Sequence, residues 1–142
     1  MHNVQSPRSD DAAIEAEIVA KGLTAPRVTP VDIENNIASE RYFTAADGVL
    51  GAYKNGGDKH PAGCSPSQSE QTALGLLTFC VLVLNNGFTV TGESACASPE
   101  NFDADLGRKI ARAAAVNKIW PLMGYELKQR LHDIKHSLPP EA

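Results

Sequence analysis

The fold is decided near the middle of the chain, by the consecutive runs LTFCVLVL (Leu77–Leu84), NNG (85–87) and FTVT (88–91). The two outer runs are rich in β-branched and aromatic residues, which favour strands. The dipeptide Asn86-Gly87 suits the two positive-φ positions of a type I′ turn. The stretch therefore predicts an antiparallel β-hairpin with a two-residue loop.

The loop length decides which side chains share a face, because successive strand residues point to opposite sides. With Asn86-Gly87 as the loop, Val83 lies opposite Val90. The face that we expect in the core then holds Phe79, Val81, Val83, Phe88 and Val90. The other face carries Cys80, Leu82 and Leu84 and is too apolar to stay bare. Since an isolated hairpin is marginal in water, a third strand, a helix or a second subunit must cover it.

Two helices, or one broken helix, are expected after the hairpin. Ser98-Pro99-Glu100 has the form of a helix start, with Asn101 and Asp103 as alternative caps. Apolar residues then recur at helical spacing, as Phe102, Leu106, Ile110, Ala113 and Trp120, and again as Leu127, Leu131 and Ile134. Pro121 lies between the two stripes and should kink or end the helix.

The segments before the hairpin complete an α+β fold: an antiparallel β-hairpin or small sheet packed against C-terminal helices, with N-terminal helical segments. Residues 10–21 and 30–41 have helical patterns. The second begins with the signal Thr29-Pro30, with Asp32 three residues after the cap, and places Ile33 and Ile37 on one face. Tyr42-Phe43-Thr44 favours extended structure but is ambiguous. We divide the chain into an N-terminal helical segment (1–50), a flexible Gly/Pro/Ser-rich loop (51–72) and a hairpin–helix core domain (73–138).

Composition excludes several classes of protein. The longest apolar run, 76–84, is far shorter than the roughly 20 residues that span a bilayer, so no membrane partner is expected. Three cysteines among 142 residues do not suggest a disulfide framework. The net charge of -4 argues against a nucleic-acid partner. Residues 1–40 nevertheless hold 7 acids and 3 bases, whereas residues 101–142 hold 5 acids and 7 bases. A solvated helix face explains this basic bias, and a patch for an anionic partner is the alternative.

The short motifs give weak signals for catalysis or metal binding. Gly92-Glu93-Ser94-Ala95-Cys96 lies where a nucleophile elbow would lie, but it lacks the second glycine. A small hydrolase using Ser94 or Cys96 is therefore the least favoured hypothesis. His60 and Cys64, even with the other two cysteines, do not have the spacing of a zinc site. We expect no catalytic residue, no metal and no cofactor.

Trp120 and Tyr125 flank the expected helix break. Core packing is the simplest explanation for both aromatic residues. The alternative is a stacking surface for a base or nucleotide, because Arg112 and Lys118 would place positive charge near the rings.

A longer ordered pattern resembles a known protein family. It comprises NGFTVTGESAC (86–96), SPENFD (98–103), GRKIA (107–111) and NKIWPL (117–122), with IASERYFTAA (37–46) upstream. Over roughly residues 76–131 the chain is similar to a family of small tailed-bacteriophage accessory proteins, named after gene products forty-nine and sixty-six of two podoviruses. The resemblance implies a phage origin, the cytoplasm of the infected bacterial host and a role outside the virion. It brings no established catalytic residue.

The leading hypothesis is a non-enzymatic phage accessory binding protein that counteracts host immunity by sequestering a small anionic or nucleotide-like ligand. It rests on analogy with small oligomeric phage proteins and on a core small enough to need a homo-oligomer. The alternative is a regulator or adaptor that binds a host protein or nucleic acid. The ligand site is expected at a subunit boundary, from Tyr42, Phe43, Thr44, Glu93, Ser94, Arg108, Arg112 and Trp120.

Overall fold

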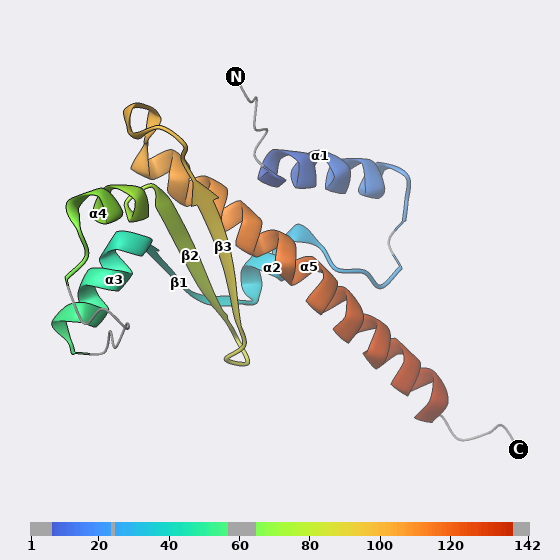
Figure 1. Cartoon of the computed structure of the whole chain (residues 1–142). Coiled ribbons are helices and arrows are strands. Elements are labelled where there is room, and N and C mark those ends of the chain that lie inside the picture. The colour runs from blue at the N-terminus through green and yellow to red at the C-terminus, as the bar shows by residue number, and fades with distance from the viewer. Residues whose placement is uncertain (1–6, 24, 57–64, 138–142) are drawn as a thin grey trace, which may run out of the picture.

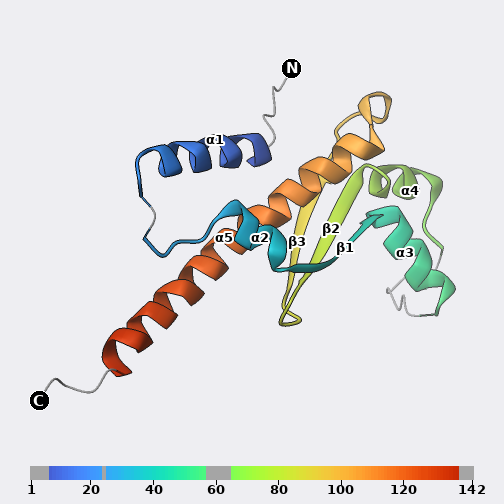
Figure 2. The same ribbon diagram turned by 180° about the vertical axis from the view of Figure 1, so that it is seen from behind.

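A three-stranded antiparallel sheet with one long helix across one face forms the body of the protein (Figures 1 and 2). The computed structural model describes residues 7–23, 25–56 and 65–137. In chain order the elements are α1 (Pro7–Ala20), α2 (Pro30–Asn35), β1 (Ile37–Thr44), α3 (Ala45–Lys54), α4 (Gln68–Leu74), β2 (Leu77–Leu84), β3 (Thr89–Ala95), a 3₁₀ turn (Pro99–Asn101) and α5 (Ala104–Ser137). The predicted α+β class is confirmed.

The third strand, β1, begins in the second half of a segment that the sequence assigns to a helix. As predicted, α2 begins at Pro30 behind a capping box between Thr29 and Asp32, but it ends at Asn35. From Ile37 the chain is extended and pairs with β2, so that the sheet order is β1-β2-β3. The predicted helix over residues 30–41 is wrong from Ile37 onward, because pairing with an apolar strand outweighs the helical spacing of two isoleucines.

The hairpin is present, but its loop is one residue longer than predicted. The Leu84 N–H donates to the Phe88 carbonyl at 2.8 Å, and the Gly87 N–H donates to the Leu84 carbonyl at 2.9 Å. Only Gly87, with φ of 88°, is left-handed among residues 85–87. A three-residue loop that ends in one left-handed residue is the next commonest hairpin connection after the two-residue turns.

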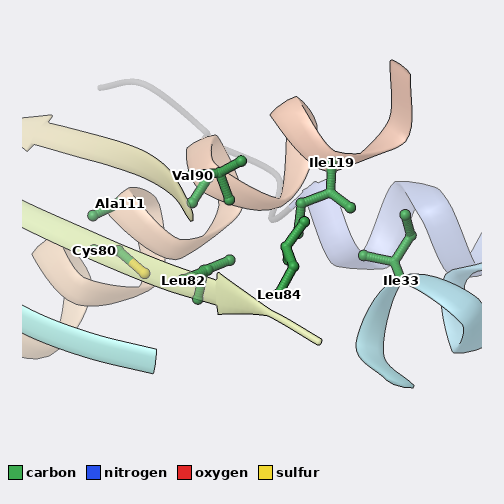
Figure 3. Packing of buried hydrophobic residues seen from close by; sticks show 8 residues of the cluster. Ile33, Cys80, Leu82, Leu84, Val90, Ala111 and Ile119 are labelled. Carbon is green, nitrogen blue, oxygen red and sulfur yellow. The ribbon is translucent and has the colours of Figure 1, made fainter. Parts of the chain in front are cut away.

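The longer loop reverses the predicted core face. Val90 now lies opposite Leu82, and Val83 lies opposite Thr89. A slip of one residue moves a strand's side chains to the other face of the sheet. The buried apolar side chains of β2 and β3 are consequently Cys80, Leu82, Leu84 and Val90, packed under α5 (Figure 3). Phe79, Val81 and Val83 are half-buried on the opposite face, and Phe88 is exposed.

Helix α5 runs unbroken through Pro121, contrary to the predicted kink or end. Proline removes one N–H donor, but the turns on both sides of it remain helical. The helix begins at Ala104, where the Asp103 carboxylate accepts the Leu106 N–H at 3.0 Å. Asp103 is one of the two alternative caps that the sequence offers. Ser98-Pro99 starts only the short 3₁₀ turn.

The side of α5 that meets the sheet consists mainly of small residues. Its buried residues are Gly107, Ala111, Ala115 and Ile119, rather than the predicted stripe, whose Leu106 is exposed. The partner on β3 is Gly92, where an added Cβ would lie 2.0 Å from the Ala111 carbonyl oxygen and 2.3 Å from the Ala115 nitrogen. Helix and strand backbones therefore touch directly, and this contact sets how closely α5 approaches β3.

The predicted flexible loop over residues 51–72 is helical at both of its ends. The last turn of α3 extends to Lys54, and α4 begins at Gln68. Capping boxes, Thr44 with Asp47 and Ser67 with Glu70, start these two helices. Between these two helices, residues 57–64, which include His60 and Cys64, lie outside the described residues. No helix in the described part of the chain is both long and apolar enough to cross a membrane.

Candidate functional site

One arginine joins α5 to α2 and β1. The Arg112 guanidinium donates to both carboxylate oxygens of Glu34, at 3.1 and 2.8 Å, and its Nε donates to Glu40 at 3.1 Å. Glu40 also accepts the Tyr42 hydroxyl at 2.5 Å. Tyr42 and Arg112, two of the predicted site residues, therefore meet through Glu40. The sequence signal that could have found Glu40 is its spacing of two from Tyr42, which places both on one side of a strand.

The ionisation of this cluster is fixed by its own members. The hydrogen bond from Tyr42 and the charge of Arg112 lower the pKa of Glu40. Burial and the Glu40 carboxylate raise the pKa of Tyr42, and the Glu34 carboxylate raises the pKa of Arg112. Glu40 stays ionised, the phenol neutral and the arginine charged at neutral pH. The cluster thus ties three elements together and offers no group poised for proton transfer.

Cys80 and Ser94 lie on the same helix-facing side of the sheet. Cys80 is opposite Tyr42 in β1 and fully buried, and burial raises the pKa of its thiol. Ser94 is opposite Thr78, which is itself opposite Thr44. Within the described ranges, no base is hydrogen-bonded to Ser94. A thiol with a raised pKa and a serine without a base are poor nucleophiles.

The other predicted site residues are spread over the molecule. Phe43 stacks on Phe79 with 5.5 Å between ring centroids, on the sheet face away from α5, and Glu93 is opposite Phe79 on that face. Arg108 binds Asp105 in the first turn of α5. Trp120 is half-buried against the core. The eight residues therefore occupy both faces of the sheet and do not line one pocket.

A groove lies between the turn end of β3 and the adjacent flank of α5. We call it the β3–α5 groove; its volume is about 570 Å³, and its lining residues are Phe88, Thr89, Val90, Thr91, Lys118, Pro121, Leu122 and Tyr125. Its lining is mostly apolar, with one ammonium group and two threonines. The Tyr125 side chain is 74% exposed and Phe88 is 53% exposed. Tyr125 and Lys118 belong to the stacking surface that the sequence suggests. Phe88 is missed because the two-residue loop assigns it to the core.

A second hollow, of about 310 Å³, is polar and lies where the hairpin tip meets α2 and α5. Its charges are already paired. Arg27 binds Glu15 through two bonds of 2.6 Å, and Arg130 binds Glu126 at 3.1 Å. The Asn85 side chain donates to the Asn35 carbonyl at 2.8 Å. These pairings make the polar hollow a poorer receptor for an anion than the β3–α5 groove.

The described residues contain no group of three histidine, cysteine or acidic side chains that could hold a metal ion. Cys96, one of the thiols considered for a zinc site, donates to the Ser98 carbonyl at 3.2 Å. His60 and Cys64 are not among the described residues.

Comparison with known proteins confirms the family that the sequence resembles. A family model for "Phage protein (N4 Gp49/phage Sf6 gene 66) family" matches residues 28–131. Neither a curated protein nor a solved structure matches the chain significantly. The matched region runs from the residue before the capping box of α2 to the middle of the exposed part of α5, and thus includes the whole sheet. The chain belongs to the N4 Gp49/phage Sf6 gene 66 family of phage proteins.

Proposed function

We propose that this phage protein is a non-enzymatic accessory binding protein that acts in the cytoplasm of the infected cell. Its role is to counteract host immunity by sequestering a small nucleotide-type ligand. The β3–α5 groove is the binding site in this proposal. The observation that supports it most is that two exposed aromatic side chains and one lysine line the same groove.

The groove offers the two interactions that a nucleotide needs. Stacking of a base on an aromatic ring contributes about 1–3 kcal/mol, and Phe88 and Tyr125 present such rings to solvent. Lys118 forms no salt bridge with the described part of the chain, so its ammonium is available for a phosphate. The volume of about 570 Å³ also lies within the range of ~300–1,000 Å³ that is usual for ligand pockets.

Calorimetry against a panel of cyclic and ADP-ribose-type nucleotides tests the proposal. We expect Tyr125→Ala and Lys118→Ala each to weaken binding about 5- to 150-fold, the equivalent of ~1–3 kcal/mol. Lys128→Ala is the matched control, because Lys128 is an exposed lysine on the same helix that does not line the groove. A folded protein that binds none of these nucleotides would refute sequestration.

A second candidate function is a regulator or adaptor that binds a host protein. The mostly apolar lining of the groove favours it, because an apolar side chain from another protein would bury there. Leu122→Asp should then abolish a defined host-protein complex in infected cells, while calorimetry shows no nucleotide binding. A nucleic-acid partner would instead give an affinity that falls steeply with salt in gel-shift titrations.

A further inference from the structure

The C-terminal part of α5 has an apolar stripe that its own chain covers only at its start, where Leu127 is half-buried and lines the polar hollow. After Ile119 no residue of α5 is buried, and residues 126–137 project beyond the hairpin (Figures 1 and 2). We call residues 126–137 the α5 overhang. Leu127, Leu131 and Ile134 recur there at i, i+4, i+7, and Ile134 is 59% exposed. Three helical turns with one apolar side are marginal in water unless that side packs against a partner.

Two lysines border this stripe on one side. With 3.6 residues per turn, Lys128 and Lys135 lie along one edge of the stripe, whereas Arg130 on the other edge is already paired with Glu126. Two overhangs packed against each other would bring these lysines close together, which is unfavourable. The complementary partner is therefore an apolar helix with an acidic edge.

Helix α1 has that pattern. Ile14 and Ile18 are one turn apart, and Ile14 is 56% exposed. Asp11 and Glu15 border them on one side, and Glu17 borders them on the other. With 14 residues, α1 spans about 21 Å, close to the ~18 Å of the 12-residue overhang.

Helix α1 uses only part of this pattern within its own chain, where Ile18 is half-buried and Ile14 is exposed. It stands apart from the sheet in both views and does not pack on the overhang (Figures 1 and 2). Its side-chain ties are Glu15 with Arg27 at 2.6 Å, in the segment that follows α1, and Glu17 with Lys21 at 2.9 Å. The Glu15–Arg27 pair holds α1 beside α2. Helix α1 therefore lies away from the overhang of its own chain, and its exposed side can contact another molecule.

We propose that α1 of one copy docks on the α5 overhang of a second copy, and that the exchange is reciprocal. Ile14 and Ile18 would cover the Leu127–Leu131–Ile134 stripe, with Asp11 facing Lys128 and Lys135; Glu15 and Glu17 are already paired with Arg27 and Lys21. Such an exchange is self-complementary, as a twofold dimer requires. It also brings the acidic first 40 residues of one copy to the basic last 42 residues of the other. This inference does not depend on a nucleotide ligand.

Sedimentation equilibrium of the full chain tests the interface. We expect a dimer whose dissociation constant rises at least tenfold in Ile14→Asp and in Ile134→Asp. Both residues are exposed, so neither change disturbs the core. Leu106→Asp is the matched control: it introduces the same charge at an exposed leucine at the other end of α5, and the dimer should persist. A monomer at millimolar concentration, or a dimer indifferent to both isoleucine variants, would overturn the proposal.

A disulfide experiment separates exchange between copies from docking within one chain. Chains carrying Ile14→Cys are mixed with chains carrying Leu131→Cys, and wild-type chains measure the background from the native cysteines. A covalent heterodimer well above that background is the expected result. If only a doubly substituted chain reacts, and does so within itself, then α1 folds back on its own overhang and the exchange is refuted.

Discussion

Gly92→Ala is the sharpest test of how α5 lies on the sheet. The new Cβ would come within 2.0 Å of the Ala111 carbonyl oxygen and 2.3 Å of the Ala115 nitrogen. Both are backbone atoms of a helix and cannot rotate away, so α5 and β3 must separate by more than 1 Å to restore van der Waals distance. That separation loosens the packing of Leu82, Val90 and Ile119 at the same time.

The magnitude follows from what overpacking usually costs. Extra methylenes in a tight core destabilise by about 1–3 kcal/mol, and a rigid neighbour puts this site at the upper end. A total stability of ~5–15 kcal/mol would be substantially reduced. In urea, with a slope of about 1–3 kcal/mol per molar, we expect the unfolding midpoint to fall by roughly 1 M or more.

Gly124→Ala is the matched control for this measurement. Gly124 also lies in α5, and nothing is within 4 Å of an added Cβ. Alanine is a better helix former than glycine by about 1 kcal/mol, so this variant should be more stable than the wild type. The two glycine-to-alanine changes should therefore shift the midpoint in opposite directions. A Gly92→Ala midpoint within error of the wild type would show that backbone contact does not position α5.

Two further measurements probe the hairpin register and the arginine cluster. Leu82→Ala should lower the free energy of unfolding by ~2–5 kcal/mol, as for a fully buried leucine. Val83→Ala, on the half-covered face, should lower it clearly less in the same urea assay. Equal losses would contradict the three-residue loop. Because the pKa of Glu40 is lowered in the folded state, its bonds to Tyr42 and Arg112 stabilise the protein above the ordinary pKa of a glutamate, and this contribution disappears as the pH falls through the lowered value. Thermal unfolding from pH 7 to pH 3 should then show a shallower acid loss in Glu40→Gln than in the wild type, and parallel curves would exclude the contribution.

The class of fold could be predicted from the sequence, because strong local signals point to it. The β-rich runs around Asn86-Gly87 indicate a hairpin, and the Thr29-Pro30 signal starts a helix where one begins. The register could not be predicted in the same way. Asn-Gly is compatible both with a two-residue turn and with a three-residue loop, and the choice between them depends on which face of β2 meets α5.

The side of α5 that packs on the sheet could not be predicted from the sequence, for a different physical reason. Hydrophobic periodicity finds large apolar side chains, but the closest part of this contact is made by Gly107, Ala111 and Ala115, which contribute little apolar area. Their role is visible only together with Gly92 on the opposing strand. Large residues such as Leu106 are then left exposed on other sides of the helix.

In the candidate sites, too, contacts between residues close in the sequence could be predicted, whereas contacts between distant residues could not. Tyr125 and Lys118 could be associated because they are neighbours on one helix, whereas Phe88 joins them only through tertiary structure. Arg112 finds Glu34 and Glu40 across more than 70 positions of the chain. No sequence spacing predicts such a pairing. The spacing of two between Glu40 and Tyr42 in β1 predicts only that these two side chains share a face.

The strand order β1-β2-β3 also has a consequence for how the chain folds. The hairpin β2–β3 closes over a three-residue loop, and α5 follows it after a short connection that contains the 3₁₀ turn. These elements can therefore form early with little loss of loop entropy. Strand β1 must instead find β2 across α3, α4 and the residues between them, and the Arg112–Glu34 bond closes over 78 positions. We expect β1 and α2 to dock last, with Glu34→Gln speeding unfolding while leaving the refolding rate nearly unchanged in stopped-flow experiments. Until that step, the backbone groups on the edge of β2 that pairs with β1 are unpaired. This edge can then pair either with β1, as in folding, or with a strand of another chain, which leads to aggregation.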